Sequence, residues 1–172
     1  MDLAFRMAEV ADEAAIWQIL QGAIQRRKED GSNQWQDGYP NPTVIQADVE
    51  RGIGYVLTDQ GSVIGYAAVL IDDEPAYANI EGTWQCSEGF VVVHRVAIAT
   101  AYLGKGLAQR LLEFVELWAQ EQQVPSMRID TNFDNKGMLR ILEKSGYNYR
   151  GEVYFRGKPR KAYEKVFGKA ID

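Results

Sequence analysis

The pattern of apolar and polar positions is clearest in the middle of the chain. An apolar, partly β-branched run from Phe90 to Ile98 predicts a buried strand. Two glycines, Gly104 and Gly106, come soon after it. Apolar residues then recur at helical spacing, at Leu107, Leu111, Leu112, Val115 and Trp118. The pattern therefore predicts a strand, a tight glycine turn and a helix that continues to Gln122.

Other elements follow from the same kind of pattern. Strands are predicted at Leu3–Met7, Gly54–Thr58, Val63–Ile71, Met127–Thr131, Tyr147–Phe155 and Ala162–Phe167. Helices are predicted from Ala11 to about Arg27, from Thr43 to about Arg51, and at Asn135–Ser145. We expect Asp12 to be the N-cap of the first helix, and Thr43 with Gln46 to form a capping box on the second.

The predicted central strand, Phe90–Ile98, also carries two polar side chains, those of His94 and Arg95. Strict alternation along it puts two sets of side chains on opposite faces: Val92, His94, Val96 and Ile98 on one, and Val91, Val93, Arg95 and Ala97 on the other. Before this strand, residues 72–87 form a polar insertion that contains Trp84 and reads as a long connection or a lid.

The length indicates one domain, residues 1–172, and the single cysteine fits a reducing cytoplasm. The chain has 172 residues, 46% of them apolar, with no apolar run long enough to span a bilayer and no secretory leader. A single cysteine excludes an internal disulfide, and one cysteine with one histidine argues against a zinc site. The net charge of −5 argues against nucleic acid as a partner and mildly favours cationic acceptors.

The glycine turn before the long helix predicts an anion site. The first N–H groups of a helix have no intrahelical partner, and the helix dipole adds positive charge there. A dinucleotide fingerprint would need a third glycine at position 109, where Gln109 stands. A nucleoside-triphosphate loop would need a longer glycine spacing and a Ser or Thr after its lysine. Either the turn binds another phosphate, or it is a helix entry without a ligand.

Two motifs in this half of the chain resemble the GNAT superfamily of N-acetyltransferases. The segment Leu103-Gly104-Lys105-Gly106-Leu107-Ala108 is similar to the signature that binds the pyrophosphate of coenzyme A. Downstream, four residues match the superfamily's second signature: Asn135, Lys144, Gly146 and Tyr147. Within that signature, Met138 replaces an alanine and Leu142 replaces a tyrosine.

The resemblance implies a fold and a cofactor. The fold is α/β of the α+β type, a mixed, mostly antiparallel sheet of about seven strands with about four helices. The fourth and fifth strands, Phe90–Ile98 and Met127–Thr131, would splay around acetyl-CoA. The residues that the resemblance assigns to cofactor binding are Val96, Ala97, Ile98, Leu103, Gly104, Lys105, Gly106, Leu107, Ala108 and Asn135.

The reaction implied is acetyl transfer to an amine by direct attack. His94 is the candidate general base, because an imidazole with a pKa of about 6.5 can take a proton near neutrality. A lone histidine on an apolar strand is also often a core residue, and Glu88 is an alternative base. The tyrosine that usually protonates the thiolate aligns with Leu142, so either another donor acts or none is needed.

The acceptor would be a small-molecule or peptide amine. Residues 34–42 contain two prolines and two aromatic residues, Trp35 and Tyr39, which either line the acceptor pocket or pack the loop onto the core. Trp84 is a further candidate from the insertion. A homodimer is compatible with the pattern. The alternative function is a non-catalytic acyl-CoA-binding sensor or interaction module on the same fold.

Overall fold

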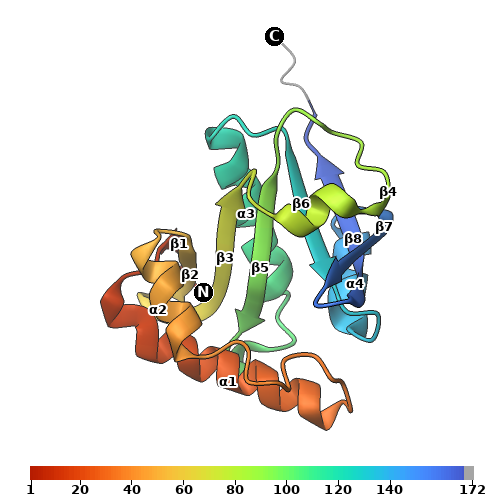
Figure 1. The fold of residues 1–172 in the computed structure, drawn as a ribbon. Helices are drawn as coiled ribbons and strands as arrows, with labels where there is room; N and C mark the ends of the chain where they lie inside the picture. The colour runs from red at the N-terminus through yellow and green to blue at the C-terminus, as the bar shows by residue number, and fades with distance from the viewer. Residues whose placement is uncertain (169–172) are drawn as a thin grey trace. The chain divides into compact units, whose positions relative to one another are not determined.

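Eight strands and four α-helices form from residues 1–168, the part of the chain that the computed structural model describes (Figure 1). The strands are β1 (Leu3–Met7), β2 (Gly54–Asp59), β3 (Ser62–Ile71), β4 (Glu81–Gly82), β5 (Val91–Ile98), β6 (Ser126–Thr131), β7 (Asn148–Phe155) and β8 (Lys158–Val166). The helices are α1 (Glu13–Glu29), α2 (Pro42–Glu50), α3 (Leu107–Glu121) and α4 (Lys136–Lys144), with 3-10 helices η1 (Val10–Asp12), η2 (Pro75–Asn79) and η3 (Thr100–Tyr102). The predicted class, a mixed and mostly antiparallel sheet with four helices, is confirmed.

The chain divides into two compact units. The first unit contains residues 1–69 and 94–114, and the second contains residues 70–93 and the described residues from 115 onward. Strands β3 and β5 and helix α3 contribute residues to both units. That all 172 residues form one domain stays a prediction.

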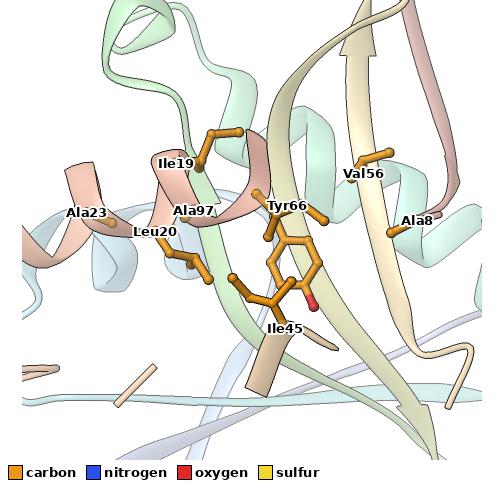
Figure 2. Close-up of a cluster of buried hydrophobic side chains, with 9 residues drawn as sticks. Ala8, Ile19, Leu20, Ala23, Ile45, Val56, Tyr66 and Ala97 are labelled. Carbon is orange, nitrogen blue, oxygen red and sulfur yellow. The ribbon is translucent and has the colours of Figure 1, made fainter. Parts of the chain in front are cut away.

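In the first unit, β2 pairs antiparallel with both β1 and β3. The end of β5 joins β3 there, because Ala99 N–H donates to the Ile64 carbonyl at 2.8 Å. Buried side chains from α1, α2, the strands and the segment after β1 form one core cluster: Ala8, Ile16, Ile19, Leu20, Ala23, Ile45, Val56, Tyr66 and Ala97 (Figure 2). Each fully buried Leu or Ile contributes about 1.5–3 kcal/mol, so this cluster holds the helices on the strands.

In the second unit, β6 pairs antiparallel with β8 along its whole length, and β8 pairs antiparallel with β7. β4 adds to the outer edge of β7, with Gly82 opposite Gly151. On its other side, β6 pairs parallel with β5 at Val91 and Val92. Within residues 1–168, no later residue of β5 has a register partner on β6, so the two strands stop pairing early.

Strand β4 raises the strand number from the predicted seven to eight, and its geometry explains why the pattern missed it. A Cβ on Gly82 would lie 2.0 Å from the Arg150 carbonyl oxygen, and one on Gly151 would lie 2.1 Å from that of Glu81. The pairing therefore needs two facing glycines. A strand of two residues shows no alternation of apolar and polar side chains.

Two local predictions were wrong, and a third was right only in position. Asn41, rather than Thr43, caps α2: its side chain accepts from Val44 N–H at 3.1 Å, and Pro42 occupies the first helical position. Asp12 holds the predicted N-cap position of α1, but its side chain makes no cap hydrogen bond there. The last strand begins at Lys158 rather than at the predicted Ala162, so the closing hairpin turns at Arg156 and Gly157.

Asp12 instead forms an ion pair with Arg6. Its two oxygens accept from Arg6 Nη1 at 2.7 Å and Nη2 at 3.0 Å, and it also accepts from Glu9 N–H. The hydrogen bond from Arg6 lowers the pKa of Asp12 below 3.8, against the opposing effect of burial. The folded state therefore gains stability from the ionised carboxylate above pH 3.8, and loses it as the pH falls through the lowered pKa.

We expect Asp12→Asn to lower the free energy of unfolding by about 1 kcal/mol at pH 7, a modest value because the Arg6 side chain is 40% exposed. The difference from the parent protein should shrink as the pH falls below 3.8. Urea unfolding at pH 7 and pH 3 measures it. An equal difference at both pH values would contradict the assignment.

No helix within residues 1–168 is both long enough and apolar enough to cross a membrane.

Candidate functional site

The turn between β5 and α3 has the geometry that an anion site requires. Gly104 and Gly106 have φ of 76° and 72°, a left-handed conformation that favours glycine. A Cβ on either residue would have no atom within 4 Å, so the backbone faces open space. Arg110 N–H donates to the Gly106 carbonyl at 3.1 Å, which marks the first intrahelical bond of α3. The N–H groups of the preceding turn are therefore available to a ligand.

Three hydrogen bonds within the first unit position this turn. Arg26 of α1 donates to Thr100 Oγ1 at 2.8 Å and to the Ile98 carbonyl at 3.1 Å. Gly22 allows α1 to approach, since a Cβ there would lie 2.9 Å from Thr100 Oγ1. The Tyr102 hydroxyl also donates to Asp59 at 3.1 Å. Leu103, Lys105 and their glycine neighbours are exposed on the supported turn.

The extended backbone of strand β5 is interrupted at Arg95, and we refer to this point as the bend of β5. Arg95 has φ of 56°, so the predicted strict alternation of side chains is broken at this residue. Val96 is half-buried, and Ala97 and Ile98 are 5% exposed. His94 is half-buried directly before the bend. All four residues lie in the first unit with the glycine turn.

The two aromatic residues of the loop before α2, residues 34–42, make different kinds of contact. Trp35 packs against the buried core cluster. Tyr39 is half-buried, and its hydroxyl oxygen accepts from Arg95 Nη1 at 2.6 Å. Trp35 thus has a packing contact, whereas Tyr39 is brought to the bend of β5.

Trp84 lies in the second unit among packed side chains. Its Nε1 donates to the Tyr77 carbonyl at 2.9 Å, and the Arg128 guanidinium carbon lies 4.3 Å from its ring centroid. The same carbon lies 3.9 Å from the Phe90 ring centroid. These contacts attach the 72–87 insertion to β6 and give Trp84 a packing role. A contact with substrate stays a prediction.

A cavity of about 310 Å³ also lies in the second unit. It is lined by Asp72, Asp73, Glu74, Pro75, Ala78, Phe90 and Arg128. None of the site residues predicted from the sequence is among them.

The second signature segment also lies in the second unit. Asn135 caps α4, with its side-chain oxygen accepting from Met138 N–H at 3.2 Å, so a cofactor contact by this residue stays a prediction. Leu142 is fully buried. Tyr147 is 4% exposed, and burial raises its pKa well above 10, which fits the predicted structural role.

Three charged residues around this turn and bend were missing from the sequence prediction. Arg26 donates to the carbonyl of Ile98 at the end of β5, Arg95 lies at the bend, and Asp48 pairs with Arg95. Two of them carry a signal in the sequence. Arg95 interrupts an apolar run, and Asp48 lies three positions after the buried Ile45 on the same face of α2.

Comparison with known proteins places this chain in one family. Residues 17–147 match the Acetyltransferase (GNAT) family. The structure of a GNAT-family acetyltransferase from Streptococcus agalactiae 2603 is 34% identical, with a TM-score of 0.87 and coverage of 97% of this chain and 96% of that one. The uncharacterized N-acetyltransferase YesJ of Bacillus subtilis (strain 168) is 22% identical over 81% of this chain and 78% of its own length.

A structure of yncA from Salmonella typhimurium with its cofactor acetyl-CoA shares the fold. It is 18% identical, with a TM-score of 0.68 and coverage of 100% of this chain and 98% of that one.

Proposed function

This chain belongs to the acetyltransferase (GNAT) family, and from that premise we propose that it transfers an acetyl group from acetyl-CoA to a primary amine. The acceptor is a small molecule or the amino group of a peptide. The observation that carries the proposal is the turn at Gly104 and Gly106, whose left-handed glycines leave the N–H groups before α3 accessible to an anion. The relative from Salmonella typhimurium carries acetyl-CoA as its cofactor, which supports the same cofactor here.

The backbone supplies most of the proposed cofactor contacts. The N–H groups of Gly104, Lys105, Gly106, Leu107 and Ala108 bind the pyrophosphate, with Leu103 beside them. Farther back along the chain, the backbone groups of Val96, Ala97 and Ile98 pair with the amides of the pantetheine arm. The register pairs of β5 with β6 are at Val91 and Val92, which precede these residues, and this supports the proposal because backbone groups unpaired on one side of a strand need another partner there.

His94 is the proposed general base. An amine attacks a thioester only when it is neutral, and the imidazole takes its proton directly or through a water. A backbone N–H near Ile98 stabilises the oxyanion that forms on the thioester carbonyl. Because Leu142 is fully buried and apolar, it donates no proton to the departing thiolate. A thiolate is a good enough leaving group that the base matters more than this acid.

Tyr39 is the acceptor-loop residue with the strongest structural support. Its half-buried ring lies at the bend of β5, whereas Trp35 and Trp84 have packing contacts that account for their rings. We therefore place the acceptor beside Tyr39. A cytoplasmic location and a homodimer remain proposals from the sequence.

Release of the coenzyme A thiol tests the function directly. The purified protein is mixed with acetyl-CoA and a panel of small-molecule and peptide amines, and free thiol is measured against a control without amine. We expect at least one amine to accelerate thiol release. Saturable acetyl-CoA binding without acceleration by any amine would instead favour the acyl-CoA sensor.

A further inference from the structure

A buried ion pair lies directly at the bend of β5. Arg95 Nε donates to Asp48 Oδ2 at 3.0 Å and Arg95 Nη2 donates to Asp48 Oδ1 at 2.6 Å, so the contact is bidentate. The Asp48 side chain is 3% exposed and that of Arg95 is 10% exposed. All of these atoms belong to the first unit. Two buried charges are costly unless their other polar atoms are satisfied too.

Two tyrosines complete the cluster. The Tyr66 ring belongs to the buried core (Figure 2), and its hydroxyl donates to Asp48 Oδ2 at 2.5 Å. Burial and the Asp48 carboxylate raise the pKa of Tyr66 far above 10, so this hydroxyl keeps its proton and stays a donor. Tyr39 accepts from the remaining Arg95 nitrogen, Nη1, at 2.6 Å. Since the Tyr39 oxygen accepts from arginine, its own O–H is directed elsewhere.

The bend itself needs such support. Arg95 adopts φ of 56°, a left-handed conformation that is unfavourable for a residue with a long side chain. A conformation of this kind persists where surrounding contacts determine it. The bidentate pair fixes the Arg95 side chain against α2, and Arg95 immediately precedes Val96, where the proposed cofactor contacts begin.

We infer that Asp48 and Arg95 are positioning residues, which hold the bend of β5 and place the 34–42 loop beside it through Tyr39. The bend then presents the backbone of Val96–Ile98 to the cofactor, and the loop presents the Tyr39 hydroxyl to the acceptor. This part of the inference rests on the proposed function. Neither charged side chain needs to touch a substrate for this role.

The matched control comes from the same unit. Asp12 and Arg6 also form a bidentate ion pair, but away from β5. Asp48→Asn and Asp12→Asn each replace the carboxylate of one such pair by an amide. We would compare them with the parent protein in two measurements, at a temperature where all three are folded. One is hydrogen–deuterium exchange of peptides covering residues 94–99 without ligands, and the other is acetyl-CoA affinity with kcat.

For Asp48→Asn we expect faster exchange over residues 94–99, about tenfold weaker acetyl-CoA binding and a fall in kcat of about 10²-fold, because a misplacement of about 1 Å can cost that much. Asp12→Asn should change none of these. Unchanged exchange and affinity in Asp48→Asn would overturn the inference, and so would equal changes in both variants.

Tyr39→Phe keeps the test decisive if Asp48→Asn does not fold. This variant removes only the oxygen that accepts from Arg95, and we expect it to raise the acceptor KM several-fold without changing acetyl-CoA affinity. Tyr154→Phe, which removes an exposed hydroxyl bonded to Glu81, is the control. An unchanged KM in Tyr39→Phe would overturn the part played by the loop. If the parent protein binds no acetyl-CoA, the proposed function fails, while the exchange measurement still decides whether the pair holds the bend.

Discussion

Gly106→Asp is expected to abolish acetyl-CoA binding while the protein remains folded. The substitution puts a carboxylate where the pyrophosphate is proposed to bind. Two unit charges about 4 Å apart at an effective dielectric constant of about 20 repel by about 4 kcal/mol, which corresponds to about a thousandfold in the dissociation constant. Calorimetric titration with acetyl-CoA measures this directly.

Two control variants separate charge from backbone strain. Gly106→Asn introduces a side chain of the same size without the charge, at the same φ of 72°, and should retain measurable binding. Gly61→Asp puts the same charge on another left-handed glycine, in the β2–β3 turn, where φ is 85°. We expect Gly61→Asp to bind acetyl-CoA normally. Unchanged affinity in Gly106→Asp would refute the assignment of the turn to pyrophosphate.

His94→Ala is expected to lower kcat by about 10²–10⁴-fold, the usual contribution of a general base. Acetyl-CoA affinity should change little, because the proposed contacts of the cofactor are with the backbone of later residues. Steady-state kinetics with a saturating amine, together with a binding titration, separates the two effects.

The pH dependence of His94→Ala provides a second, independent readout. If His94 takes the proton from the amine, the parent protein and the alanine variant should differ in how turnover depends on pH. Normal turnover across the pH range in His94→Ala would remove the residue from the mechanism and leave it a packing role.

The regular elements were predicted where local pattern decides them. The apolar run of β5 and the helical spacing after Leu107 both depend on neighbouring residues, and the structure confirms both elements within a residue at the ends that border the turn. The glycine turn between them was also predicted, because left-handed backbone strongly favours glycine.

What the pattern missed depends on distant partners. The bend at Arg95 is supported by Asp48, 47 positions earlier in the chain, and no local signal pairs the two. Strand β4 exists because Gly82 and Gly151 face each other. Similarly, Thr43 is a good capping residue by type, but Asn41 followed by Pro42 already starts the helix.

The same distinction applies to the candidate site. Resemblance of motifs led to the turn at residues 103–108, and the structure gives that turn an open, left-handed backbone. For the aromatic residues, composition alone left packing and substrate contact open. The contacts of Trp35 and Trp84 favour packing, while the hydrogen bond from Arg95 brings Tyr39 to the bend of β5.

Calorimetric titration of the purified protein with acetyl-CoA, with NAD and ATP as controls, tests the proposed cofactor site most directly. We predict saturable binding of acetyl-CoA and no binding of NAD or ATP. Absence of acetyl-CoA binding by the folded protein would mean that the glycine turn is only the start of α3, and it would contradict the proposed transferase function.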